Sequence, residues 1–287
     1  MVPGKKEIIA APKPFINLRI LSPILLYATV LLIGLLVAVP FVWMILTSLK
    51  PRSEIYSSFF LPKHVTFENY KTVFETSHFG RWYVNSLITA CLATTSVIFF
   101  DSLAGYALAK YKFRGQSLVL LVILSTMMIP NEMLLIPWYM MARNNGWINT
   151  YWGIVFPEFM TAFGVFLMHQ FMQGIPDDLL DAGRIDGLSE FGLFWKVALP
   201  LVRPALSALA IFTFLSSWNA FLWPVIVTES SKMWTLPVGL AYFSGEFETR
   251  WELVMTGATI ATVPVLIAFV ILQRHIIRGI MLTGLKS

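Results

Sequence analysis

Charged residues are scarce in this chain. Of its 287 residues, 13% are Asp, Glu, Lys or Arg, whereas 57% are hydrophobic. Soluble domains have about 25% charged and about 45–50% apolar residues, and the mean hydropathy of +0.70 lies well on the apolar side. A soluble fold cannot bury so much apolar surface, but a lipid bilayer can accommodate it. The composition therefore predicts a membrane protein.

Several features that carry chemistry are also missing. The single cysteine, Cys91, excludes an intramolecular disulfide and a cysteine-based metal site, and its apolar surroundings indicate a packing residue. The chain has no Gly-x-x-x-x-Gly-Lys-Ser/Thr segment, so it lacks that cradle for ATP phosphates. Nothing resembles a catalytic triad or a metal cluster. The net charge of +5 does not indicate nucleic acid, because the basic residues mostly flank apolar runs and there set membrane topology.

Six apolar runs are long enough to cross a bilayer as helices of about 20 residues. They cover about residues 22–47, 84–108, 118–140, 152–172, 204–227 and 252–273. Membrane helices tolerate proline because neighbouring helices satisfy the freed backbone groups. We expect kinks or broken helices at the prolines in or near these runs, which are Pro40, Pro130, Pro137, Pro157, Pro224 and Pro264. The sequence predicts an all-α membrane protein with six transmembrane helices.

Basic residues predict the topology. The first apolar run is too long for a signal peptide, and it follows Lys5, Lys6, Lys13 and Arg19. This arrangement favours a cytoplasmic N-terminus, and six spans then return the C-terminus to the same side. We divide the chain into a cytoplasmic segment 1–21, a membrane domain 22–273 and a cytoplasmic tail 274–287. The long external loop 50–81 is expected to form short surface helices.

The cytoplasmic loop at about 173–203 has the signals of two short helices. Pro176 and the acidic pair that follows it favour the start of a helix, and Gly187 can end that helix. Ser189 can cap the second helix, and Pro200 can end it. The loop thus predicts a helix–turn–helix.

Each of the two short helices has a predicted apolar face. In the first helix the residues expected to turn inward are Leu179, Leu180, Ala182 and Ile185. In the second, the face at i, i+3, i+4 and i+7 consists of Phe191, Phe194, Trp195 and Ala198. An aromatic face on a cytoplasmic loop requires either the lipid interface or a partner protein, and the residues alone leave both open.

The spacing within this loop resembles the EAA loop of ABC importer permeases. The family motif reads Glu-Ala-Ala, three residues, Gly, nine residues and Ile-x-Leu-Pro. This chain has Asp181-Ala182-Gly183, then Gly187, then Val197-x-Leu199-Pro200. Asp181 replaces Glu, which keeps the charge but shortens its reach, and Gly183 replaces Ala, which adds flexibility.

Other segments are similar to the carbohydrate branch of that family, the maltose-transporter-type inner-membrane permeases. The resemblance runs from about residue 22 to the C-terminus. The segments that carry it are Ile175-Pro176, Arg184-Ile185-Asp186-Gly187, Asn85-Ser86-Leu87, Ala104-Gly105-Tyr106-Ala107, Trp218-Asn219, Leu222-Trp223-Pro224, Gln273-Arg274 and Arg278-Gly279.

The resemblance implies a permease subunit that is not itself an enzyme. The loop would dock on a separate ATPase dimer, which binds ATP and Mg, and would transmit its closure as a rigid body. The residues assigned to this coupling are Asp181, Ala182, Gly183, Asp186, Gly187, Phe191, Phe194, Trp195, Leu199 and Pro200. The further partners implied are a homologous second permease, a periplasmic or lipid-anchored solute-binding protein, a sugar and the lipid of a bacterial inner membrane. No cofactor is expected in this chain.

Polar residues within the apolar runs are candidates for the substrate path. Sugars are held by aromatic faces together with amide or carboxylate hydrogen bonds. The candidates are Asn131, Glu132, Trp218, Asn219 and Trp223, with helix packing as the alternative role for the tryptophans. Asp101 and Glu158 are more readily explained by structural hydrogen bonds.

Three other functions stay open on the sequence. An importer for glycerol phosphate or another polyol would need a basic cavity, which the nearly Lys- and Arg-free spans do not favour. A proton-coupled transporter or an intramembrane enzyme would use the scattered carboxylates Asp101, Glu132 and Glu158.

Overall fold

The computed structural model describes residues 18–57, 59–245 and 249–284. Within these ranges every regular element is a helix, so the predicted all-α class is confirmed for the part of the chain that is described. Residues 1–17 of the predicted N-terminal segment and 285–287 of the predicted tail lie outside it.

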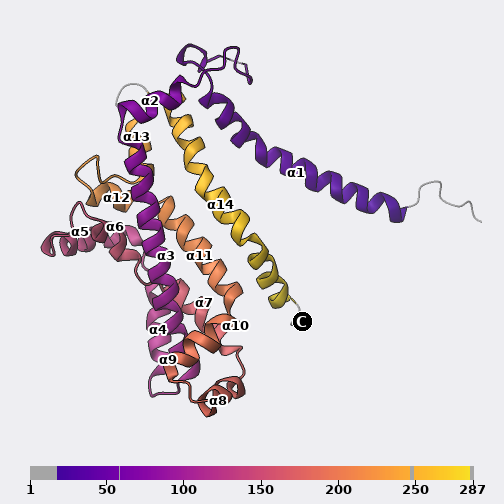
Figure 1. Ribbon diagram of the computed structural model, residues 1–287, viewed down its shortest axis with the longest axis vertical. Helices are drawn as coiled ribbons and strands as arrows, with labels where there is room; N and C mark the ends of the chain where they lie inside the picture. The colour runs from indigo at the N-terminus through magenta and orange to yellow at the C-terminus, as the bar shows by residue number, and fades with distance from the viewer. Residues whose placement is uncertain (1–17, 58, 246–248, 285–287) are drawn as a thin grey trace, which may run out of the picture.

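Three helices are long and apolar enough to span a membrane. They are α1 (Leu18–Ser48), α3 (Phe79–Lys110) and α14 (Trp251–Gly284). α3 runs through the middle of the body, whereas α1 diverges from the body (Figure 1). Pro40 and Pro264 lie inside α1 and α14 without ending them. Neither helix is broken at its proline, so of the two expected effects only a kink stays a prediction at these positions.

Three further candidate spans are pairs of helices joined at a sharp bend. The first pair is α4 (Gln116–Thr126) with η2 (Asn131–Leu134) and α5 (Leu135–Asn144), bent by 91°. The second is α6 (Tyr151–Val155) and η3 (Phe156–Glu158) with α7 (Ala162–Gln173), bent by 48°. The third runs from α9 (Glu190–Leu193) through η4 (Phe194–Ala198) and α10 (Leu199–Leu201) to α11 (Arg203–Trp218), bent by 84°. By length and composition, the described residues therefore contain three helices that could cross a membrane, or up to six if each bent pair counts as one span.

Three of the predicted runs are interrupted, and the run 152–172 breaks between η3 and α7. The run 118–140 is not one helix, because α4 ends at Thr126 and Pro130 precedes η2. The run 204–227 is also interrupted, since α11 ends at Trp218 and the chain resumes helical structure only in α12 (Leu222–Val227). Proline cannot donate the backbone hydrogen bond that a continuous helix needs at Pro130. Hydropathy averages across such breaks and does not detect them.

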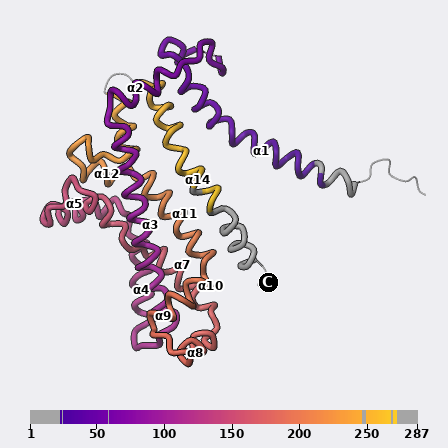
Figure 2. The backbone as a smooth tube through the Cα atoms, in the orientation of Figure 1, coloured from indigo at the N-terminus to yellow at the C-terminus, as the bar shows by residue number. Residues whose placement is uncertain are grey.

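The remaining elements are short. The loop after α1 contains η1 (Arg52–Glu54) and α2 (Glu68–Thr76), which confirms the expected surface helices. The other short helices are α8 (Asp177–Ile185) and α13 (Leu236–Tyr242). α2 and α13 lie at one end of the molecule and α8 and α9 at the opposite end (Figure 2).

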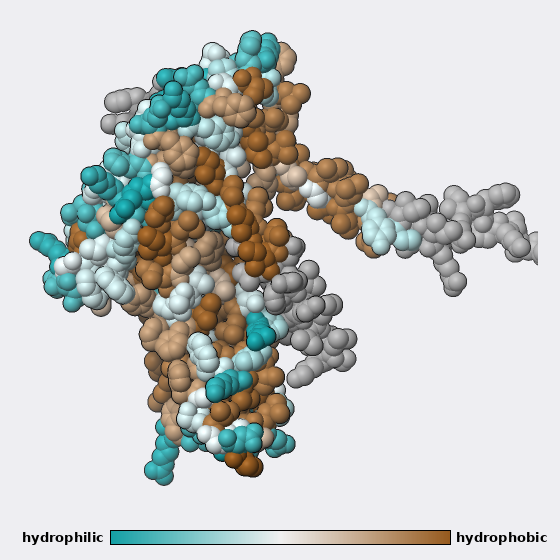
Figure 3. Space-filling view, in the orientation of Figure 1, coloured by the Kyte–Doolittle hydropathy of each residue, from teal (hydrophilic) through white to brown (hydrophobic). Residues whose placement is uncertain are grey.

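Buried side chains form three clusters along the molecule. One joins α3, α7, α8, η4 and α11 at the α8 end. The second joins α2, α3, α11, α13 and α14 at the opposite end, and the third joins α3, α5, α6 and α12. Hydrophilic residues gather near α2 and α5, while apolar residues cover α1 and much of the body (Figure 3). An exposed apolar surface of this extent is expected of a protein that faces lipid or other membrane subunits.

Candidate functional site

The turn between α8 and α9 has the geometry that its sequence predicts. Gly187 adopts φ +83°, a left-handed conformation that favours glycine. The Gly187 and Leu188 amides donate to the carbonyls of Arg184 and Gly183, each at 3.0 Å, which satisfies the end of α8. The Ser189 hydroxyl accepts from the Gly192 amide at 3.2 Å and caps α9. Both ends of the turn are therefore closed by hydrogen bonds.

The predicted inward face of α8 is mostly wrong. Leu180 is buried at 2% exposure, but Leu179 and Ala182 are exposed and Ile185 is 87% exposed. Gly183 is the other buried residue of α8. A helix that packs through a glycine sits too close to its neighbour for several large side chains to share the contact.

The predicted single face of the second helix is also wrong. Phe194 and Ala198 are buried, but Phe191 and Trp195 are 57% and 56% exposed. Residues Phe194–Ala198 form a π turn, so a period of 3.6 residues does not apply through them. Pro200 lies inside α10 and does not end the helical path, which continues to Leu201 before the bend. The exposed apolar side chains of the loop are therefore Leu179, Ala182, Ile185, Phe191 and Trp195.

Gly183 has a packing role rather than the flexibility that the sequence suggested. A Cβ at this position would lie 2.5 Å from Cδ2 of Leu193, which is fully buried. Sequence reasoning missed Leu193, although it is the residue that seals α8 against α9.

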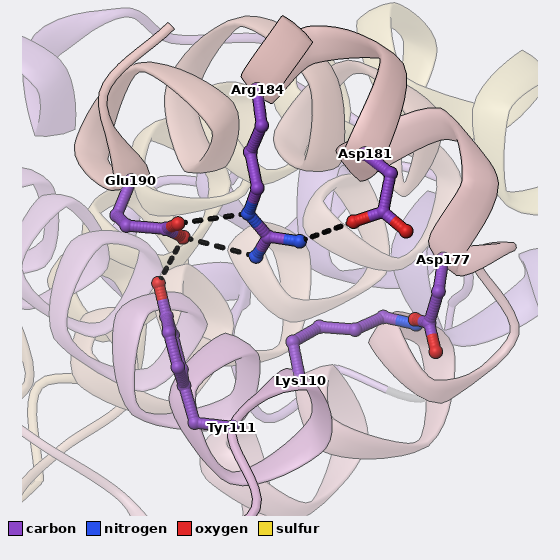
Figure 4. Close-up of polar contacts among 6 residues, drawn as sticks. All are labelled: Lys110, Tyr111, Asp177, Asp181, Arg184 and Glu190. Atoms are coloured by element: carbon purple, nitrogen blue, oxygen red, sulfur yellow. Dashed lines mark hydrogen bonds and ion pairs between the residues drawn. The ribbon is translucent and has the colours of Figure 1, made fainter.

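A polar network joins this loop to the end of α3 (Figure 4). Arg184 donates to Asp181 at 2.6 Å, to Oε1 of Glu190 at 2.9 Å and to Oε2 of Glu190 at 3.3 Å. The Tyr111 hydroxyl donates to Glu190 at 2.5 Å. The Arg184 and Tyr111 hydrogen bonds lower the pKa of Glu190 below its ordinary value. Glu190 therefore links the turn to α3 as a carboxylate.

A second link holds the start of α8. The Lys110 ammonium donates to the Ile175 carbonyl at 2.5 Å and to Asp177 at 2.7 Å. The hydrogen bond from Lys110 lowers the pKa of Asp177. Sequence reasoning did not single out Lys110, Tyr111 or Glu190 for this role, because their proximity depends on how the loop folds back on α3.

A cleft of about 700 Å³ lies at the breaks of the first two bent pairs and beside the gap between α11 and α12. Asn131, Glu132 and Trp223, three of the predicted substrate-path residues, line it together, and Glu158 lines it as well. No Lys, Arg or His occurs among the described residues that line this cleft. The basic cavity that a glycerol phosphate importer would need is absent there.

The two tryptophans are held by contacts within the chain. The indole nitrogen of Trp223 donates to the carbonyls of Gly153 and Ile154 at 3.0 and 3.1 Å. Trp218 is buried and stacks on Phe214 at 5.8 Å between ring centroids. Its ring face is thus occupied, which argues against the sugar-stacking platform suggested for the Trp218-Asn219 pair.

Trp218 and Asn219 are also separated from the other substrate-path residues. They line a second cavity of about 370 Å³ together with Phe41 and Thr262. The structure therefore does not bring the five predicted substrate-path residues together in one site.

Asp101 is fully buried and serves the start of α7. It accepts hydrogen bonds from the Thr161 amide at 3.1 and 3.2 Å and from the Thr161 hydroxyl at 2.7 Å. Thr161 is itself the N-cap of α7. These contacts agree with the structural role expected for Asp101. Within the described ranges no group of three or more His, Cys, Asp and Glu residues could hold a metal ion.

Comparison with known proteins places the chain in a family. The family described as "Binding-protein-dependent transport system inner membrane component" matches residues 102–282. The arabinooligosaccharides transport system permease protein AraQ of Bacillus subtilis is 35% identical, over 90% of this chain and 93% of AraQ. The diacetylchitobiose uptake system permease protein NgcG of Streptomyces coelicolor is 31% identical, over 87% of this chain and 84% of NgcG.

A solved structure shares the fold. It is described as a bacterial ABC transporter involved in the import of the acidic polysaccharide alginate, and one of its chains matches with a TM-score of 0.79. That match covers 91% of this chain and 99% of the other at 22% identity, so it concerns the fold alone. With the family match and the relatives together, the chain belongs to the inner-membrane components of binding-protein-dependent transport systems, and it is an ABC transporter permease subunit rather than an enzyme.

Proposed function

We propose that this chain is one permease subunit of an ATP-driven importer for an oligosaccharide. AraQ and NgcG are named for arabinooligosaccharides and diacetylchitobiose, both of them short saccharides. The 700 Å³ cleft, with Asn131, Glu132 and Trp223 on its wall, is the segment of the path that this subunit contributes.

The loop at 176–200 couples the permease to a partner ATPase, which holds ATP and Mg. The observation that carries this proposal is the exposure of Phe191 and Trp195, two aromatic residues on a loop that is braced to α3. Exposed aromatic residues on a rigid element are the usual anchors of a protein interface. The lipid interface is the competing explanation, and the experiment below distinguishes the two.

The other coupling residues have different roles. Gly183, Gly187 and Phe194 shape and support the loop, whereas Ala182 and Asp186 are exposed on it. Leu199 and Pro200 carry motion to α11 through the 84° bend. Asp181 is engaged by Arg184 within the chain, so the aromatic residues anchor the ATPase more strongly than this carboxylate does.

The subunit works as part of a hetero-oligomer in the inner membrane of a bacterium. Both termini and the loop face the cytoplasm, where the ATPase dimer binds. A homologous second permease covers α1, and a periplasmic or lipid-anchored solute-binding protein docks at the α2 and α13 end. The basic residues around the apolar runs support this orientation.

The experiment compares Phe191→Ser/Trp195→Ser with Phe113→Ser, an exposed aromatic residue at the same end but outside the loop. Each interface anchor contributes about 2 kcal/mol or more, so we expect the double variant to lose the ATPase in co-purification while the control retains it. Saccharide uptake in cells should fall with it. If the ATPase still co-purifies, or if uptake survives ATP depletion and collapses with the proton gradient, the proposed coupling is wrong.

A further inference from the structure

The cleft is the place where three interrupted spans meet. Its wall includes Thr126 and Asn131 at the first break, Glu158 and Thr161 at the second, and Ala220 after α11. Helix ends leave backbone amides and carbonyls without intrahelical partners. Inside a membrane such groups are tolerated only where they are buried in protein or line a polar cavity. Broken helices that converge on one cavity are a common way to form a binding site for a polar solute.

The ionisable side chains on the described wall of the cleft are all acidic. Glu132 and Glu158 are the charged residue types on the described wall, and the polar residues beside them, such as Ser216 and Thr161, are neutral. The Glu132 side chain is exposed. Behind the wall, Asp101 holds Thr161, and the hydrogen bonds that it accepts come from the Thr161 amide and hydroxyl. An exposed carboxylate on the wall of a cleft acts on charges that enter, because the walls of lower dielectric focus its field.

We propose that this cleft excludes anions, with Glu132 as the main determinant. On the proposed saccharide-import function, it takes uncharged or amino-bearing saccharides and rejects those that carry carboxylate or phosphate groups. Repelling the wrong ligand is an effective source of specificity. The fold match alone would suggest otherwise, since that transporter is described as importing an acidic polysaccharide. The charge of the cleft separates this chain from such a substrate.

The single cysteine makes a direct test practical. In a Cys91→Ala background, Ser216→Cys places one thiol in the cleft of the assembled transporter. The rates of its modification by a cationic (trimethylammonium-ethyl) and an anionic (sulfonatoethyl) methanethiosulfonate are compared. Thr262→Cys in the second cavity, which no charged residue lines among those described, provides the reference ratio. Thr126→Cys repeats the measurement if Ser216→Cys does not assemble.

The cation-to-anion rate ratio in the cleft should exceed the reference by about tenfold, the lower end of typical electrostatic enhancement. Glu132→Gln should remove most of that preference and Glu158→Gln less, while the remote control Glu75→Gln should leave it unchanged. Tetragalacturonate, an anionic saccharide, should not slow labelling. A ratio equal to the reference, a ratio insensitive to Glu132→Gln, or protection by tetragalacturonate overturns the proposal. The importer function is judged separately, by ATPase co-purification and uptake.

Discussion

Two glycines allow close helix contacts, but they differ in what lies opposite them. A Cβ on Gly105 would meet the His169 amide nitrogen and the Met168 Cβ, each at 2.7 Å, so the obstacle includes the α7 backbone. A Cβ on Gly183 would meet the far end of the Leu193 side chain at 2.5 Å. A side-chain end can rotate away, whereas the backbone of a packed helix cannot.

We therefore expect Gly105→Ala and Gly183→Ala to have different effects on stability. Gly105→Ala should destabilise the protein by about 1–3 kcal/mol through overpacking. Gly183→Ala should be close to neutral, because alanine gains about 1 kcal/mol of helix propensity that offsets the displacement of Leu193. Thermal unfolding of the purified protein in detergent measures both. An equal loss of stability in the two variants would show that α8 and α9 cannot shift to make room for the added methyl group.

At the scale of elements, the loop from α8 to α9 is stiff for reasons that lie partly outside it. Its turn closes through the Gly187 and Leu188 amides. Glu190 and Asp177 then attach it to Tyr111 and Lys110 at the end of α3. A loop with these connections moves with α3, which is what transmission of force through it requires.

The turn itself can be tested with a matched pair of glycines. Gly187 and Gly115 have φ values of +83° and +88°, and a Cβ at either position would contact nothing within 4 Å. Alanine at either site should cost about 1–2 kcal/mol from backbone strain alone. Only Gly187→Ala should reduce ATP-dependent uptake beyond its effect on stability. An equal loss of uptake in Gly115→Ala would attribute the defect to strain in general.

The polar network predicts a loosening of the loop in acid. The folded pKa values of Glu190 and Asp177 lie below their ordinary values, because Arg184 and Tyr111 bind Glu190 and Lys110 binds Asp177. Carboxyl groups with lowered pKa values stabilise the fold above their unfolded pKa values, and this contribution is lost as pH falls through the folded pKa values. We expect amide exchange in α8 and α9, corrected for the intrinsic rate, to rise below about pH 4. Glu190→Gln should show faster exchange already at pH 7, and Glu75→Gln should not.

At the scale of the whole molecule, α1 is the long helix whose side chains are least covered by the rest of the described chain. Almost all described side chains from Leu25 to Trp43 are exposed. Its end packs on α14, where the Thr256 hydroxyl donates to the Ser48 carbonyl at 3.3 Å. The rest of α1 leaves the body, as Figure 1 shows. In the membrane this surface faces either lipid or the second permease.

A photo-crosslinking residue on α1 decides between these two surroundings. Benzoylphenylalanine at Leu32 or Leu35, both exposed, should give an adduct with the mass of two permease chains. The same residue at Val65, in the loop after α1, should not. Adducts with lipid alone would show that α1 does not pack on a second subunit.

The membrane class, the helical content and the turn at Gly187 followed from the sequence, because they depend on local properties. Hydropathy reports transfer into lipid, and a left-handed turn requires glycine whatever surrounds it. The family resemblance likewise followed from the spacing of Asp181, Gly187 and Pro200 along the chain.

Only the tertiary structure decided which side of each short helix is buried and which of the prolines interrupt a span. The packing of α8 through Gly183 and the π turn after Leu193 left Phe191 and Trp195 exposed, against the periodicity. Likewise, the fold placed Asn131, Glu132 and Trp223 on one cleft and Trp218 and Asn219 on another. These outcomes depend on contacts between residues far apart in the sequence, and neither hydropathy nor periodicity along one segment records such contacts.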